Sequence, residues 1–91
     1  YGKSACWFSG FTLRNGKMES GELRKSLRER GVDARPFWKP IHLQVPFGGC
    51  PREELGVTDE LWSTLVTLPC STSLSNADQS TVIKHVQELL G

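Results

Sequence analysis

Cations and aromatic side chains are concentrated in one segment of the chain. Arg35, Lys39 and His42 stand there beside Phe37 and Trp38. An arginine fork binds a phosphate or a carboxylate through two hydrogen bonds, and an imidazole adds a further donor. We therefore predict that Arg35, His42 and Lys39 bind an anionic substrate. A structural role stays open, because an arginine can pair with a nearby acid, a histidine can bond to loop backbone, and aromatic rings often pack in cores.

Three prolines stiffen the same segment. Pro36, Pro40 and Pro46 each fix their own φ angle and push the preceding residue toward extended backbone. We therefore expect an extended strip rather than a helix. The loop that follows contains Gly48 and Gly49, and we expect it to be less ordered than the helices.

Other potentially reactive groups lack suitable partners in the sequence. Glu53 and Glu54 are consecutive, so their side chains should diverge, which disfavours paired acid–base catalysis. The three cysteines form no Cys-x-x-Cys pair, and the two histidines do not stand at zinc-ligand spacings. We expect reduced cysteines, no catalytic residue and no metal in this chain.

Length and composition narrow the class of protein. The chain has 91 residues, which is at most one domain, so we expect residues 1–91 to form a single domain. The formal net charge of +1 gives no electrostatic case for nucleic acid as a partner. The sequence shows no membrane-length apolar run and no signal peptide, so we expect a cytoplasmic protein. A start at Tyr1 rather than methionine would fit a domain excised from a longer protein.

The expected strands are short. Residues 5–13 are aromatic and partly β-branched, and Gly10 within them indicates a bulge or a close backbone approach. Asn15-Gly16 predicts a turn. Residues 32–38 and 66–68 are the second and third expected strands.

Three helices are expected around these strands. The first covers residues 19–30, with Ser20 as N-cap and Gly31 as the stop. The second begins near Thr58 as the cap. The third begins near Ser75, because the spacings Ser75-x-x-Asp78 and Asn76-x-x-Gln79 both resemble a capping box. Its expected buried stripe consists of Val82, Ile83, Val86, Leu89 and Leu90.

The motifs in this order resemble the C-terminal end of the DegT/StrS-type sugar-nucleotide aminotransferases. The Gly-Val…Arg…Pro-Ile-His pattern of residues 31–42 is similar to that family's segment, and Leu68-Pro69 and a closing helix follow it as in the family. The aromatic strand with Trp7 is similar to the strand that opens the family's C-terminal domain. The likeness covers nearly the whole chain.

The resemblance implies a fold, a cofactor and partners. The fold is α/β, an α+β small domain with a short, three-stranded, mainly antiparallel sheet and three helices, as in the C-terminal domain of the aspartate aminotransferase fold. The reaction would move an amino group from an amino acid, often glutamate, to a nucleotide-linked keto-sugar, as in polysaccharide biosynthesis. Pyridoxal 5'-phosphate (PLP) and its lysine would lie in a large domain of a homodimeric full-length enzyme. This chain would contribute the substrate-side residues Arg35, His42 and Lys39 and would be inactive alone.

Two other functions remain open. The strip around Arg35 and His42 could belong to a non-catalytic module that binds an anion or a peptide. The chain could also be part of a PLP enzyme of the same fold that uses a different substrate.

Overall fold

The structure is a computed structural model that describes residues 2–14 and 16–91. Two strands, β1 (Ser9–Thr12) and β2 (Leu65–Leu68), pair antiparallel with Ser9 opposite Leu68 and Thr12 opposite Leu65. The helices are α1 (Ser20–Glu29), α2 (Gly56–Thr64) and α3 (Asn76–Leu90). Two 3-10 turns, η1 (Ile41–Leu43) and η2 (Val45–Phe47), precede α2.

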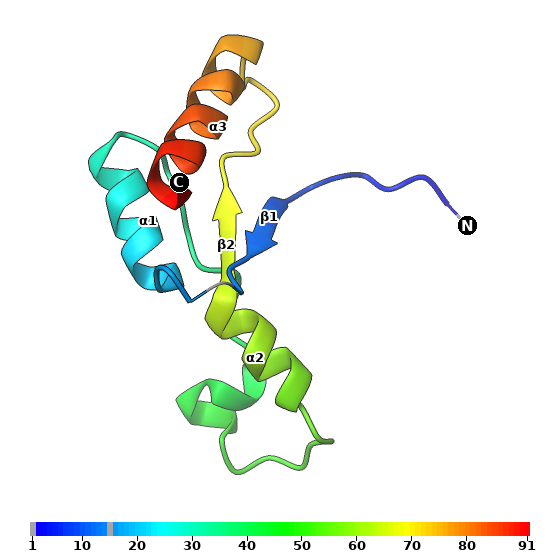
Figure 1. Cartoon of the computed structure of the whole chain (residues 1–91). Helices are drawn as coiled ribbons and strands as arrows, with labels where there is room; N and C mark the ends of the chain where they lie inside the picture. The colour runs from blue at the N-terminus through cyan, green and yellow to red at the C-terminus, as the bar shows by residue number, and fades with distance from the viewer. Residues whose placement is uncertain (1, 15) are drawn as a thin grey trace.

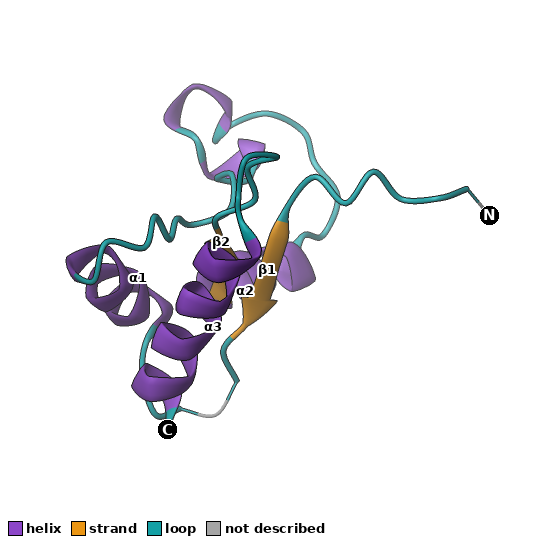
Figure 2. Cartoon of the chain, turned by 90° about the horizontal axis from the view of Figure 1, so that it is seen from above, coloured by secondary structure: helices purple, strands orange, loops and turns teal. Residues whose placement is uncertain are grey.

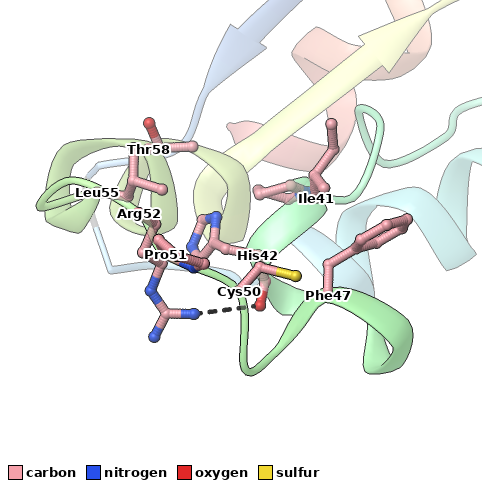
Figure 3. Close-up of a pocket in the computed structure, with 9 residues that line it drawn as sticks. Ile41, His42, Phe47, Cys50, Pro51, Arg52, Leu55 and Thr58 are labelled. Carbon is pink, nitrogen blue, oxygen red and sulfur yellow. Dashed lines mark hydrogen bonds between the residues drawn. The ribbon is translucent and has the colours of Figure 1, made fainter.

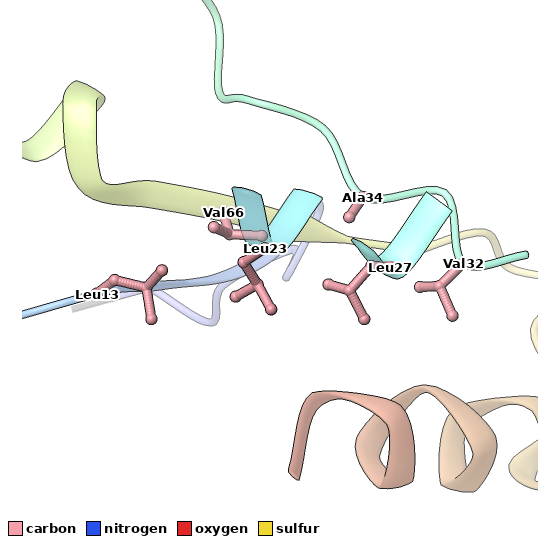
Figure 4. Packing of buried hydrophobic residues seen from close by; sticks show 6 residues of the cluster. All are labelled: Leu13, Leu23, Leu27, Val32, Ala34 and Val66. Carbon is pink, nitrogen blue, oxygen red and sulfur yellow. The ribbon is translucent and has the colours of Figure 1, made fainter. Parts of the chain in front are cut away.

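The core lies where α1, α3 and the sheet meet (Figures 1 and 2). Leu23 and Leu27 stand one turn apart on α1, and Val66 lies on β2; all three are fully buried. Figure 4 shows the core side chains on the side of α1 and β2 that faces α3. Leu13, Leu23, Leu27, Val32, Ala34 and Val66 form this buried cluster.

The last helix packs on this core, as its periodicity predicts, with one exception. Val82, Val86, Leu89 and Leu90 pack against the buried cluster. Ile83 was expected on the same stripe but is 47% exposed. At 100° per residue it falls beside the stripe, so the expectation for Ile83 was wrong.

The second expected strand forms only one bridge. Arg35 and Thr67 exchange backbone hydrogen bonds of 3.2 and 2.9 Å, and the Thr67 hydroxyl also donates to the Arg35 carbonyl at 2.8 Å. The next hydrogen-bonded pairs of this antiparallel ladder would join Asp33 to Pro69 and Phe37 to Leu65. Pro69 has no N–H to donate, and the Phe37 carbonyl accepts from the Trp62 indole instead. The sheet among the described residues therefore has two strands and not three, although its pairing is antiparallel as expected.

The first strand is shorter than expected. Cys6 has a φ of +49°, which interrupts extended backbone before Trp7. In the observed register Phe8 would stand opposite Pro69, which has no N–H, and β1 begins only at Ser9. Gly10 makes the predicted close approach, because a Cβ there would lie 2.7 Å from the Val66 carbonyl oxygen. Asn15, in the predicted turn, lies outside the described residues.

The helix starts differ from the predicted caps at two of three positions. The N-cap of α1 is Glu19, whose backbone N–H donates to the Glu22 carboxylate at 3.1 Å. Ser20 instead donates its hydroxyl to the Ser63 carbonyl at 2.7 Å and joins the start of α1 to the end of α2. Thr58 lies inside α2 and is not its cap.

The predicted signals for the end of α1 and the start of α3 are confirmed. Gly31 takes a φ of +79° just after α1, a left-handed conformation that suits glycine. The Ser75 hydroxyl accepts from the Asp78 backbone N–H at 3.1 Å and caps α3.

The expectation of an extended strip was wrong between Ile41 and Phe47. Pro40 directly precedes η1, and Pro46 occupies the first turn of η2, where a missing N–H removes no helical bond. A 3-10 turn needs only three residues, so prolines that exclude an α-helix still permit it. In Figure 1 these turns and α2 form a lower lobe away from α1 and α3.

Candidate functional site

The lower lobe contains a pocket of about 360 Å³ between the 3-10 turns and α2 (Figure 3). His42 lies on one wall, and its side chain is only 8% exposed. Arg52 lies on the opposite loop, and its guanidinium donates to the carbonyls of His42 at 3.4 Å and Gly48 at 3.5 Å. The remaining wall is mainly apolar and consists of Pro40, Ile41, Phe47, Cys50, Pro51, Leu55 and Thr58.

His42 is fixed by a carboxylate from α2. Its Nε2 lies 2.5 Å from Asp59 Oδ1, and the Asp59 side chain is 46% exposed. The couple joins η1 to α2, 17 residues further along the chain. The His42 side chain thus forms part of the pocket wall, and its one side-chain hydrogen bond is to Asp59.

Arg35 lies on the bridge to β2, and its side chain is exposed. Its Nε donates to Asp33 Oδ1 at 3.0 Å, and its side chain is 72% exposed. The hydrogen bond to Asp33, and then the charge of that carboxylate, raise the pKa of the guanidinium above its ordinary value. Arg35 therefore remains a permanent cation, and its terminal nitrogens have no hydrogen-bond partner among residues 2–14 and 16–91.

Lys39 is exposed and makes a backbone contact only. Its carbonyl accepts from Gln44 Nε2 at 2.9 Å. This bond spans η1 from one end to the other. The Lys39 ammonium makes no ion pair within the described part of the chain.

The three predicted binding residues do not share one cavity. Arg35 lines a separate cavity of about 330 Å³ with Phe8, Asp33 and Thr67. His42 lines the pocket of the lower lobe, and Lys39 lines neither of these cavities. The short sequence distance between Arg35 and His42 suggested one strip, but η1 turns the chain between them.

Sequence reasoning missed the two charged partners of His42. Arg52 and Asp59 contact it from a loop and a helix that come later in the chain. Asp59 carried only a weak signal as an acid in the first turn of an expected helix. Arg52 carried none, because its position depends on how the loop folds back.

An exposed aromatic cluster lies beside the segment that carries Arg35. The rings of Trp7, Phe8, Phe37 and Trp38 are arranged with centroids 4.9 to 5.7 Å apart, some stacked and some edge to face. Trp7 is 68% and Trp38 64% exposed. Trp62 donates its indole N–H to the Phe37 carbonyl at 3.0 Å and fixes that backbone. The rings pack on one another and leave a large apolar surface uncovered.

The lysines of this chain are placed where the sequence predicts, on its surface. PLP in an aminotransferase requires a lysine whose amine is buried or activated by a neighbour. Every lysine of this chain lies on the surface, and none lines the His42 pocket or the Arg35 cavity in the described part. The lysines are Lys3, Lys17, Lys25, Lys39 and Lys84. No helix in the described residues is long and apolar enough to cross a membrane.

Comparison with known proteins defines the family. Residues 3–87 match the model of the DegT/DnrJ/EryC1/StrS aminotransferase family. The match spans both the Arg35 bridge and the His42 pocket. The chain belongs to the DegT/DnrJ/EryC1/StrS aminotransferase family.

Individual relatives agree with this assignment. EpsN of Bacillus subtilis (strain 168), named as a pyridoxal phosphate-dependent aminotransferase, is 31% identical over 92 residues, which cover 97% of this chain and 24% of EpsN. A DegT DnrJ EryC1 StrS aminotransferase from Brucella abortus has a TM-score of 0.76 at 25% identity, covering 92% of this chain and 22% of that protein. Helicobacter pylori PseC, an aminotransferase involved in the biosynthesis of pseudoaminic acid, shares the fold with a TM-score of 0.74 at 17% identity, over 89% and 22% of the two chains. This chain thus spans about a quarter of the length of these relatives.

Proposed function

We propose that this chain is the small C-terminal domain of a PLP-dependent aminotransferase. The full-length enzyme would transfer an amino group from an amino acid, with glutamate as the first candidate, to a nucleotide-linked keto-sugar. The family match over residues 3–87 is the observation that carries the proposal. The quarter-length coverage of EpsN agrees with one domain of a larger protein, so residues 1–91 would be a single domain of it.

Arg35 is proposed to bind an anionic group of the substrate. Its charge is permanent, its Nε is held by Asp33, and its two terminal nitrogens make no hydrogen bond to the described residues. An arginine so anchored can still offer a two-pronged contact to a phosphate or a carboxylate. Lys39, exposed on the same strip, would add a second positive charge.

His42 is proposed as a second substrate contact, at the wall of the lower-lobe pocket. Its imidazole is nine-tenths buried and immobilised by Asp59, so a ligand contact there would be directional. Arg35 and His42 line different cavities, so they would contact different parts of one extended substrate. A nucleotide-sugar is such an extended molecule.

The proposed partner of the aromatic cluster is the large PLP-binding domain of the same polypeptide. Two indole rings more than 60% exposed leave an apolar surface that a neighbouring domain would cover. The cofactor and its lysine would belong to that domain, since the residues described here supply neither. A homodimer and a cytoplasmic location stay predictions from the family resemblance.

The full-length protein tests this function directly. We expect it to bind PLP and to convert the ketone of a nucleotide-linked keto-sugar to an amine while glutamate becomes 2-oxoglutarate, one molecule for one. Mass spectrometry of the sugar measures the amino group gained by the acceptor, and quantification of 2-oxoglutarate measures the amino group lost by the donor. Omission of glutamate is the control. Amino transfer without a nucleotide-sugar would instead indicate a PLP enzyme with another substrate. Ligand binding with neither PLP nor turnover would indicate a binding module.

A further inference from the structure

The His42–Asp59 couple constrains which imidazole nitrogen can meet a ligand. The carboxylate of Asp59 only accepts hydrogen bonds, so the nitrogen 2.5 Å away, Nε2, is the one that carries the proton. A neutral imidazole has a proton on one nitrogen only, which leaves Nδ1 as an acceptor. Asp59 therefore sets the tautomer of His42.

Nδ1 of His42 remains available, although the ring is largely buried. It has no hydrogen-bond partner among the described residues. Among the described residues, no side-chain nitrogen or oxygen is both buried and without a hydrogen-bond partner. Nδ1 is therefore accessible, on a side chain that is otherwise only 8% exposed and lines the lower-lobe pocket.

Arg52 keeps this part of the pocket wall in place. Its guanidinium bridges the His42 and Gly48 carbonyls and so joins η1 to the loop beyond η2. The rest of the wall is mainly apolar and offers few competing polar groups. A ligand that enters this pocket meets the Nδ1 acceptor and the Arg52 guanidinium within an otherwise mainly apolar wall, where a directed hydrogen bond is selective.

We infer that His42 Nδ1, positioned by Asp59, accepts a hydrogen bond from a hydroxyl group of a bound ligand in the lower-lobe pocket. The inference rests on the proposed function, in which that hydroxyl belongs to the sugar of the nucleotide-sugar. It gives His42 the role of acceptor toward a neutral group and leaves the anionic groups to Arg35. Asp59 is a positioning residue that acts through His42.

The tautomer is measured on the full-length protein labelled with ¹⁵N-histidine. Long-range proton–nitrogen spectra at about pH 8.5, where an imidazole is ordinarily neutral, distinguish the protonated from the bare ring nitrogen. His42→Gln assigns the signals. We expect wild type to carry the proton on Nε2, because a carboxylate can only accept from that nitrogen. Asp59→Leu should give a mixture of tautomers.

Glu60→Gln is the matched control. Glu60 is the next residue on α2, is exposed, and makes no side-chain hydrogen bond within the described residues, so removing its charge should leave the His42 signals unchanged. A proton on Nδ1 in wild type, or an unchanged tautomer in Asp59→Leu, would overturn the positioning role.

The ligand is tested on the same labelled protein. The probes are UDP-glucose, dTDP-glucose and GDP-glucose, each compared with its own nucleoside diphosphate, and calorimetry measures binding in parallel. We expect the Nδ1 signal to shift with a bound nucleotide-sugar and not with the diphosphate alone. A nucleotide-sugar that binds without moving Nδ1 would reject the subsite and leave the proposed function standing. Failure of all three to bind would reject the proposed function and this subsite with it.

Discussion

Replacement of Gly10 by alanine should destabilise the fold through one backbone clash. The new Cβ would lie 2.7 Å from the Val66 carbonyl oxygen on the paired strand, whereas real Cβ atoms essentially never come within 3.0 Å of such a neighbour. A backbone oxygen cannot rotate away, so β1 must move from β2 by several tenths of an ångström. The Val66 side chain is fully buried, and the shift therefore reaches the core.

The expected cost follows from two opposing effects. Forcing extra volume into a well-packed site typically costs about 1–3 kcal/mol. Alanine restricts the unfolded chain more than glycine and offsets about 0.4–1 kcal/mol of this. We expect a net loss in the free energy of unfolding, with a fall in Tm of about 4–8 °C for each kcal/mol in a domain of this size.

Urea denaturation of the 91-residue chain, followed by far-UV circular dichroism, measures this loss. Gly49→Ala is the matched control, because no atom lies within 4 Å of its Cβ position and its φ is not in the left-handed range. We expect this control to be as stable as wild type or slightly more stable. Equal midpoints for Gly10→Ala and Gly49→Ala would refute the close approach of β1 and β2.

Four further outcomes are expected. In the full-length protein, Arg35→Ala should weaken nucleotide-sugar binding several-fold, as measured by calorimetry, because the arginine would bind the substrate through charge-assisted hydrogen bonds. PLP occupancy should not fall, because the cofactor's lysine would lie in the large domain. Unchanged binding would contradict a substrate role. The 91-residue chain alone should fold but catalyse nothing, and borohydride treatment with PLP should mark no single lysine stoichiometrically. Amide exchange should be faster in residues 43–50 than in the three helices, because few long-range backbone bonds hold that segment; uniform protection would count against this. Trp38→Ser should leave the isolated chain folded but lower the Tm of the full-length protein, because the ring is exposed in the isolated chain and would be covered by the large domain in the full-length protein. Equal changes in the Tm of the two proteins would argue against docking at the aromatic cluster.

The helices could be predicted from the sequence because their signals are local. Leu23 and Leu27 stand one turn apart, Gly31 ends α1, and Ser75 caps α3 through the backbone of Asp78. Each of these signals acts within a few residues, so it does not depend on the rest of the fold. The family resemblance of residues 31–42 was likewise present in the order of side chains alone, and the match over residues 3–87 confirms it.

The sheet was predicted less well, because strand formation depends on partners elsewhere in the chain. The β2 strand was recognised from its apolar residues, and it pairs with β1 from the other end of the sequence. The second expected strand is reduced to a single bridge between Arg35 and Thr67. Pro69, which would pair with Asp33, has no N–H, and the Phe37 carbonyl bonds to the Trp62 indole instead of to β2. A propensity pattern indicates that a segment can be extended, but only a neighbour with free hydrogen-bonding groups makes it a strand.

The composition of the candidate site was decided by the tertiary structure. The sequence identified Arg35 and His42 as the residues with suitable chemistry, and it placed them on one strip. The 3-10 turn at Ile41–Leu43 then carries His42 away from Arg35 and brings it against Asp59, 17 residues later. A hydrogen bond between distant residues depends on how the intervening chain returns, and no local pattern encodes that path. Side-chain chemistry is thus readable from the sequence, whereas the partner that fixes a tautomer or covers an aromatic face is set only when the chain packs.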